Sequence, residues 1–389
     1  MLLLRIGMAL VVSLLIACGG PSNNAGEDNE TMSKAALGES LFSDVNLSLN
    51  RSQSCATCHD PEHAFIDPRD NGVGGAVSLG DDGVSLGDRN APTAAYAMLV
   101  PGFHINSDEE PVGGQFHDGR EDDLAGQAGG PPTNAIEMGM PDKAATVERL
   151  IENSNYVAAF QQLFGDDIFN DIEQAYASMA ESIAAFEMTD AFAPFDSKYD
   201  RSRSSYDGDD PYTMTDQESL GETLFFSEQF TNCQLCHQLK SLPGRKEELF
   251  SNHGYFNIAI PVNDAVRTMN GKGASHIDHG LLENPQVSNP AHDGKFKVPS
   301  LRNIAVTGPY MHNGVFADLR TVVLFYDKFN NPARTLNPET GLAWADPEVP
   351  ATVATIDLEE GSALSDDEVD AVAAFLNTLT DQRYEHLIE

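Results

Sequence analysis

The sequence is short of basic residues. Its 389 residues include 23 Lys and Arg against 60 Asp and Glu, which gives a formal net charge of -37 at pH 7. This imbalance argues against binding to nucleic acid or to an anionic membrane surface, because both carry negative charge. A basic protein partner and a surface that stays soluble in salty water both fit the charge, and composition does not separate them.

Long apolar runs are also scarce, and the one at the N-terminus is too short to span a bilayer. In MLLLRIGMALVVSLLIACGG, roughly a dozen apolar residues follow Arg5, as is typical of an export signal. The end of this run resembles a bacterial lipobox, so we predict a signal peptide at 1–17, a lipid anchor on Cys18 and a flexible tether at 18–33. The alternative is an ordinary secretory signal. Both interpretations predict export to the periplasmic side, and the lipobox predicts attachment to a bacterial membrane, which we expect to be the outer one.

Cysteine is limited to five residues. With Cys18 assigned to the lipid, the other four fall into the motifs CATCH (55–59) and CQLCH (233–237), and none is left for a disulfide. Cys-x-x-Cys-His is the attachment signal of c-type haem, because helical spacing places both thiols and the imidazole on one face. We therefore predict two covalently bound haems held through Cys55, Cys58, Cys233 and Cys236.

The histidine of each motif is then the predicted proximal iron ligand, His59 in the first and His237 in the second. A zinc site built from the four cysteines, or a redox-active dithiol, is the alternative for these motifs. Neither alternative requires a histidine directly after each cysteine pair, so haem is the interpretation that uses every residue of the motif.

A weak internal repeat surrounds the two motifs. ALGESLF (36–42) precedes the first and SLGETLF (219–225) precedes the second, and leucines four apart would lie on one helix face. The repeat predicts an N-terminal haem domain at 34–200, a linker at 201–211 and a C-terminal haem domain at 212–389. The predicted fold class is mainly α, with two c-type cytochrome domains, each around one covalently bound haem, and long irregular loops. Helices are expected at 143–165, 171–188, 216–226, 318–328 and 365–379. The last is expected to start with a capping box formed by Ser365 and Glu368.

Two haems admit an electron carrier or an enzyme with one open iron, and longer motifs favour the enzyme. The sequence resembles the bacterial dihaem cytochrome c peroxidases and their relatives of the MauG type. The segments that carry the resemblance span nearly the whole chain in the family's order: CATCHDPEHAF (55–65), RNAPT (89–93), FHDGREDDLAGQAGGPPTNAIEM (116–138), CQLCH (233–237) and VPSLRNIAVTGPYMHNG (298–314).

The resemblance implies that the first haem reacts with hydrogen peroxide. Its distal pocket would contain Gln127, Pro131 and Glu137, and Glu137 would move a proton between the peroxide oxygens. Without the motif, Glu137 would be expected to be a solvated surface acid. The resemblance also implies one calcium ion between the haems, held by the side chain of Asn90 and the backbone carbonyls of Thr307 and Pro309.

Two departures from the family pattern alter these expectations. Some members carry a distal histidine before the RNAPT segment, but no histidine occurs between His63 and His104, and Asp82 stands near the matching position. The first iron is therefore expected to be five-coordinate at rest. The family often has a tryptophan between the haems where this chain has His117, which we consider a possible interhaem relay, a propionate partner or, least favoured, a third iron ligand.

The sixth ligand of the second haem is the residue that separates the two branches of the family. Its expected position, fourteen residues after His312, is Tyr326, whereas many peroxidases have methionine there and MauG-type proteins have tyrosine. Val322, Phe325 and Tyr326 are expected to face the haem from one helix. Without the motif, Tyr326 would be expected to be a core tyrosine. Met311, in the loop associated with calcium, is the other candidate and is expected to be core.

These expectations lead to one main function and two alternatives. The main prediction is a peroxidase that reduces hydrogen peroxide at the N-terminal haem while the C-terminal haem relays electrons from a c-type cytochrome or cupredoxin. The first alternative is a MauG-like enzyme that uses peroxide-derived high-valent haem to oxidise residues of a protein substrate. The weaker alternative is a non-catalytic dihaem electron carrier.

Overall fold

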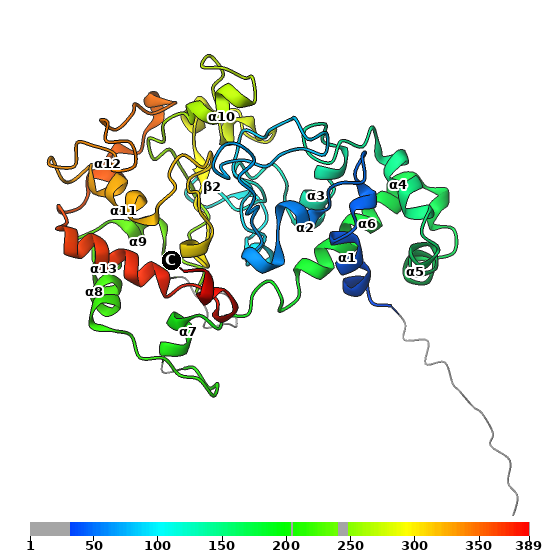
Figure 1. The fold of residues 1–389 in the computed structure, drawn as a ribbon, viewed down its shortest axis with the longest axis horizontal. Helices are drawn as coiled ribbons and strands as arrows, with labels where there is room; N and C mark the ends of the chain where they lie inside the picture. The colour runs from blue at the N-terminus through cyan, green and yellow to red at the C-terminus, as the bar shows by residue number, and fades with distance from the viewer. Residues whose placement is uncertain (1–31, 204, 240–247, 389) are drawn as a thin grey trace, which may run out of the picture. The chain divides into compact units, whose positions relative to one another are not determined.

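The structure is a computed structural model that describes residues 32–203, 205–239 and 248–388. The predicted signal peptide, Cys18 and most of the predicted tether lie outside the described residues. Met32–Glu389 forms one compact unit (Figure 1). None of the helices described for the chain is long and apolar enough to cross a membrane.

Helices and irregular loops make up nearly all of the described chain, as predicted, and the strands are only two residues long. β1 (His104–Ile105) pairs with β2 (Pro111–Val112), and β3 (Tyr255–Phe256) pairs with β4 (Phe296–Lys297), both antiparallel. The α-helices are α1 (Lys34–Phe42), α2 (Cys55–Cys58), α3 (Leu124–Ala128), α4 (Lys143–Ile151), α5 (Ser154–Phe164), α6 (Ile172–Glu187), α7 (Lys198–Ser202), α8 (Asp216–Phe225), α9 (Cys233–Cys236), α10 (Asp264–Met269), α11 (Leu319–Asp327), α12 (Thr355–Glu359) and α13 (Asp366–Asn377).

One predicted element differs from the structure. The single helix expected at 143–165 is wrong, because α4 ends at Ile151 and α5 starts after Asn153, whose side chain accepts a hydrogen bond from the amide of Asn155. This cap satisfies a free amide of the new helix and breaks the old one. In the second copy of the repeat, Leu220 and Leu224 lie four residues apart in α8 as predicted, but only Leu224 is buried and Leu220 is 45% exposed.

The buried residues gather into two large clusters, and each is built on one helix pair. α1 packs on α6, and α8 packs on α13 (Figure 1). Equivalent glycines of the repeat make both contacts possible: a Cβ on Gly38 would lie 1.8 Å from the carbonyl oxygen of Ser182, and a Cβ on Gly221 would lie 1.9 Å from that of Ala371. The predicted domain boundaries remain predictions; the start of the predicted linker, Arg201, is buried and lies in α7.

Candidate haem sites

Both Cys-x-x-Cys-His motifs fold as the haem interpretation requires. The cysteines of each motif bound a one-turn helix, α2 or α9, and the following histidine closes that turn. The amide of His59 donates to the carbonyl of Cys55, and the amide of His237 donates to the carbonyl of Cys233, both at 2.9 Å. The two thiols and the imidazole of each motif therefore lie on adjacent turns of one helical segment.

Each histidine ring is oriented by a backbone carbonyl. Nδ1 of His59 lies 3.1 Å from the carbonyl oxygen of Phe65, and Nδ1 of His237 lies 2.8 Å from that of Phe250. These contacts place the ring proton on Nδ1 and leave each Nε2 without a hydrogen-bond partner among the residues that the structure describes. Burial lowers the pKa of His237 to about 4 and also lowers the pKa of His59, so both rings are neutral at pH 7. A neutral ring held through Nδ1 is the form that binds iron.

A large cavity opens beside the second motif, and its lining fits a haem. Cys233, Cys236 and His237 line it, together with Tyr326 from α11. The hydroxyl of Tyr326 has no hydrogen-bond partner in the part of the chain that the structure describes, although burial beside the two thiols raises its pKa well above the usual range. A core tyrosine normally satisfies its hydroxyl, so this unpaired oxygen fits an iron ligand.

Two neighbours of Tyr326 behave differently from it. Met311 also borders the cavity but packs against an apolar cluster that includes Tyr310 and Phe316, as expected of a core residue. Phe325 was expected to face the haem, and this expectation is wrong: the ring is fully buried against Phe316 and Trp344. Val322, one turn before Tyr326, does line the cavity.

The zinc alternative finds no support in the structure. Cys55 packs against the first core cluster and Cys233 against the second, so the four thiols do not converge. In the described ranges, no three His, Cys, Asp or Glu side chains are grouped to hold a metal ion.

The predicted distal residues lie in one short stretch that begins in α3. Gln127 belongs to α3, Pro131 starts the next turn, and the amide of Met138 donates to the carbonyl of Pro131 at 3.3 Å, which folds Glu137 back toward them. Glu137 lies close enough to Cys58 to raise the pKa of that thiol. Burial raises the pKa of Glu137 itself, and nearby Arg120 opposes the shift. A partly buried carboxyl beside the first motif is suited to proton transfer.

The loop that precedes the RNAPT segment contacts Glu137 through its backbone. The amide of Asp81 donates to the carbonyl of Glu137 at 2.7 Å. Asp82, at the position where some relatives carry a histidine, accepts hydrogen bonds from the amides of Val84 and Ser85 within its own exposed loop. The Asp82 side chain is therefore committed to its own turn.

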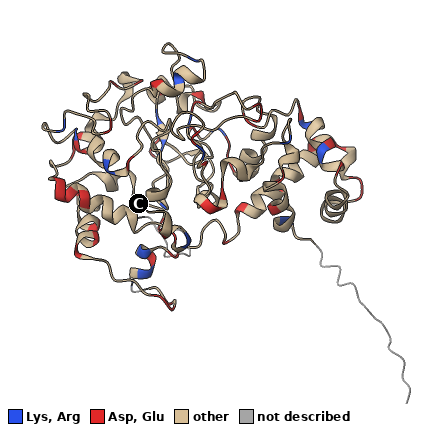
Figure 2. Ribbon diagram, in the orientation of Figure 1, with Lys and Arg blue, Asp and Glu red and all other residues tan. Residues whose placement is uncertain are grey.

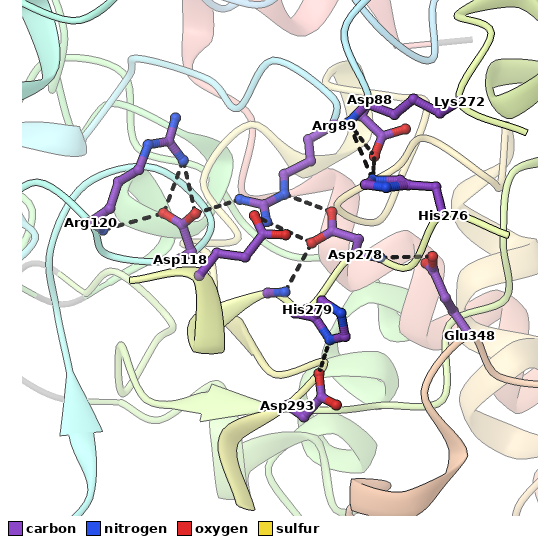
Figure 3. A network of polar contacts seen from close by, with 12 residues as sticks. Asp88, Arg89, Asp118, Arg120, Lys272, His276, Asp278, His279, Asp293 and Glu348 are labelled. Carbon is purple, nitrogen blue, oxygen red and sulfur yellow. Dashed lines mark hydrogen bonds and ion pairs between the residues drawn. The ribbon is translucent and has the colours of Figure 1, made fainter. Parts of the chain in front are cut away.

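A buried ion-pair network joins Arg89 and Asp118, in the first half of the chain, to Asp278 in the second half (Figure 3). Arg89 binds Asp118 and Asp278, each at 2.6 Å, and Asp118 also binds Arg120. Asp118 and Asp278 are 1% and 3% exposed at their side chains, so Arg89 supplies charge where water does not reach. Burial acts to raise the pKa of Asp278. The hydrogen bonds and the positive charge of Arg89 outweigh it and hold this pKa well below the usual range.

His117 and the three predicted calcium ligands border the same cavity as Tyr326. Nε2 of His117 lies 2.9 Å from the carbonyl oxygen of Asn90, and burial lowers the pKa of His117 to about 4. The side-chain amide of Asn90 donates to the carbonyl of Ala76 at 3.1 Å. The structure thus brings Asn90, Thr307 and Pro309 into one region, and calcium binding there stays a prediction.

His312 is a site residue for which the sequence predicts no role of its own. Its ring stacks on Phe296 at 3.6 Å between centroids, it is 7% exposed, and its buried Nε2 has no partner among the described residues. His312 also borders the cavity. The only signal for it in the sequence is its place in PYMHNG, which says nothing of the stacking or the free nitrogen.

Comparisons with known proteins agree with these motifs. A family model described as di-haem cytochrome c peroxidase matches residues 32–208. Methylamine utilization protein MauG of Paracoccus denitrificans is 49% identical over 389 residues, which cover 100% of this chain and 98% of that protein. Cytochrome-c peroxidase IdrP1 of Denitromonas iodatirespirans is 30% identical over 313 residues, which cover 76% of this chain and 73% of that protein.

One solved structure extends the likeness to three dimensions. The diheme peroxidase BthA from Burkholderia thailandensis superposes with a TM-score of 0.77 at 32% identity, and the match covers 92% of this chain and 88% of that one. The arrangement of helices and loops described above is therefore that of a diheme peroxidase.

Proposed function

Because the chain belongs to the di-haem cytochrome c peroxidase and MauG family, whose members are oxidoreductases that use peroxide, we propose that it is a MauG-like enzyme that oxidises residues of a protein substrate. The observation that carries the proposal is Tyr326, an unpaired phenol in the cavity of the second motif. An anionic oxygen ligand stabilises oxidised iron, whereas a thioether favours reduced iron. Such a second site stores oxidising equivalents better than it accepts electrons.

The chain's own residues would hold and serve two c-type haems, which would supply peroxide activation and a store of oxidising equivalents. Cys55 and Cys58 would attach the first and Cys233 and Cys236 the second. His59 and His237 would bind the irons through Nε2, and Tyr326 would be the second protein ligand of the second iron. Glu137 would move a proton between the two peroxide oxygens, with Gln127 and Pro131 shaping the pocket, and Arg120 would limit how far the Glu137 pKa rises.

A peroxidase that draws electrons from a small cytochrome or cupredoxin is the second candidate, and the identity to a cytochrome-c peroxidase favours it. The two candidates differ in whether the protein consumes peroxide continuously with electrons from a small donor protein. Steady consumption of peroxide with reduced cytochrome c supports the peroxidase, whereas a long-lived oxidised state that forms in the absence of a donor supports the MauG-like enzyme.

The further roles are proposals of the same kind. Asn90, Thr307 and Pro309 would hold calcium, and His117 would connect the two haems through its contact with Asn90. The protein would act on the periplasmic side, attached to the membrane only through Cys18. A protein substrate or donor with a basic surface would complement the strong negative charge.

An electron paramagnetic resonance spectrum of the resting ferric protein tests the proposal. We expect one five-coordinate high-spin iron and one iron with a phenolate ligand. Tyr326→Met should remove the phenolate signature and raise the reduction potential of the second haem, because a thioether favours the ferrous state. Met311→Leu is the matched control and should leave both properties unchanged. A Tyr326→Met spectrum identical to the wild type would exclude Tyr326 as the ligand.

A further inference from the structure

Tyr96 and Asp381 form a buried phenol–carboxylate pair that the proposed function does not use. The Tyr96 hydroxyl donates to Oδ1 of Asp381 at 2.5 Å, across 285 residues of sequence. Tyr96 is 1% exposed and Asp381 is fully buried. The pair is therefore shielded from water and depends on its own hydrogen bonds.

The surroundings hold both groups in place. The side-chain amide of Asn303 donates to Oδ2 of Asp381 at 2.8 Å, and the amide of Phe195 donates to the Tyr96 hydroxyl at 3.2 Å. The Tyr96 backbone is left-handed, with φ 62°, which is strained for a bulky residue and persists only where the fold over-determines it. The backbone amide of Tyr96 donates a hydrogen bond to the carbonyl of Phe192 at 2.9 Å, which helps to hold this conformation.

Tyr96 is connected through neighbouring residues to the structures that orient both proximal histidines. On one side, the amide of Ala94 donates to the carbonyl of Phe65, which also accepts the hydrogen bond of His59. On the other side, the Arg302 guanidinium lies 5.5 Å from the Tyr96 ring and 5.2 Å from the ring of Phe250. The carbonyl of Phe250 accepts the hydrogen bond of His237.

Tyr96 also borders the cavity that contains His237, Tyr326 and His117. His117 is an imidazole and is hard to oxidise. A phenol loses an electron much more easily when a base at hydrogen-bond distance takes its proton in the same event. Of these cavity residues, Tyr96 is the one whose hydroxyl has a carboxylate as its hydrogen-bond acceptor.

We propose that Tyr96 and Asp381 are a proton-coupled redox pair that holds one oxidising equivalent between the two haem sites. Tyr96 gives up one electron to an oxidising equivalent derived from peroxide, its O–H bond breaks, and the proton forms a new bond to Oδ1 of Asp381. The products are a neutral tyrosyl radical and a protonated Asp381. An electron from the protein substrate or donor then reduces the radical, and the proton returns. The inference rests on the proposed function for its oxidant.

The acid–base state of the pair agrees with this direction of transfer. Burial raises the pKa of Asp381 to about 6, so the carboxyl is mostly ionised at pH 7.5 and can accept a proton. The pKa of Tyr96 is raised well above its usual range, first by burial and then by Asp381, so the resting phenol keeps its proton. The other charged or titratable groups that face the pair are Arg302, Asp200, Asp196 and Tyr384.

Freeze-quench paramagnetic resonance of the haem-loaded protein after addition of hydrogen peroxide tests the pair. In the wild type we expect a radical signal that narrows when ring-deuterated tyrosine is incorporated. Tyr96→Phe should lose this signal, and Asp381→Asn should reduce its yield while peroxide is still consumed. Tyr255→Phe is the matched control, because Tyr255 is also buried and donates at 2.5 Å, but to the carbonyl of Gly113, which is not a base. It should keep the signal.

The outcomes separate this inference from the proposed function. If the wild type neither consumes peroxide nor changes its haem absorption, the proposed function fails. If it consumes peroxide but the radical is absent, or survives unchanged in Tyr96→Phe, the redox pair is overturned and the function stands. High-field spectra of the wild type need no variant: the radical should show the g-value of a hydrogen-bonded phenoxyl, and a g-value without hydrogen bonding would assign it elsewhere.

Discussion

Glu137 combines partial burial, a raised pKa and a position beside the first motif. Glu137→Gln preserves the shape of the side chain and removes its acid–base chemistry. We expect the rate of reaction with peroxide to fall by about 10²–10⁴-fold, the usual contribution of a positioned acid–base group. Stopped-flow absorption at the haem band measures this rate. Glu148→Gln, on an exposed surface of α4, should react like the wild type, and equal rates in both variants would remove Glu137 from the reaction.

Glu187, the last residue of α6, is a buried acid that affects the pH dependence of stability. It is 5% exposed, one carboxyl oxygen has no partner among the described residues, and burial raises its pKa to about 8 from a usual value of 4.5. Between these values the unfolded chain has lost a proton that the folded protein keeps, so stability must fall as pH rises from about 4.5 to about 8.

Glu187→Gln removes this loss of stability. Relative to the wild type, the variant should gain on the order of 3–4 kcal/mol of unfolding free energy between pH 5 and pH 8, because each pKa unit is worth roughly 1.4 kcal/mol. Guanidinium unfolding of the haem-loaded protein at the two pH values measures the change. Glu181→Gln, on the exposed side of the same helix, is the control. Parallel pH dependence in wild type and Glu187→Gln would show that Glu187 does not titrate in this range.

The helix pairs α1–α6 and α8–α13 are packed in the same way. In each copy of the repeat, a glycine at the same position lets the two helices approach closely. Gly38→Ala and Gly221→Ala would drive a methyl group into the carbonyls of Ser182 and Ala371. Alanine favours an exposed helix by about 1 kcal/mol, but overpacking costs roughly 1–3 kcal/mol or more, so both variants should be less stable.

Thermal unfolding of the two glycine variants measures the effect, with the exposed neighbours Glu39→Ala and Thr223→Ala as controls expected within about 0.5 kcal/mol of the wild type. A glycine variant as stable as its control would mean that the helices separate at little cost. Equal losses of stability in Gly38→Ala and Gly221→Ala would show that the two copies of the repeat share the same close helix–helix contact, in addition to their similar sequences.

For the molecule as a whole, the Arg89 network is one polar connection between segments far apart in the chain (Figure 3). Arg89→Ala would leave Asp118 and Asp278 buried with less compensating charge. Removing one partner of a buried ion pair typically costs about 3–5 kcal/mol, so we expect a large loss in unfolding free energy. Arg51→Ala breaks only the exposed pair with Glu152 and should cost less than about 1 kcal/mol. Equal losses in the two variants would contradict a special role for Arg89.

Negative charge is spread widely over the molecule, and the first turn of α13 carries three acids in a row (Figure 2). Ser365 and Glu368 form the capping box predicted from the sequence, so part of this charge stabilises the helix start. The charge on α13 therefore has a local structural role, and the identity of a partner has to come from function.

Local patterns were enough to predict the elements that depend on neighbours in the chain. Both haem-attachment turns, the helices of 171–188, 216–226, 318–328 and 365–379, and the cap of α13 follow from spacings of a few residues. The one long helix that was wrong, at 143–165, broke at a cap that an apolar periodicity cannot reveal. The family likewise followed from motifs that are contiguous in sequence.

Contacts between distant segments were decided only by the tertiary structure. No local pattern brings Tyr96 to Asp381 or Arg89 to Asp278. Their partners are chosen by how the helix pairs and loops pack, and a buried polar group acquires its chemistry from those partners. The sequence by itself therefore determined which cofactors the chain can attach, and packing decided which side chains surround them.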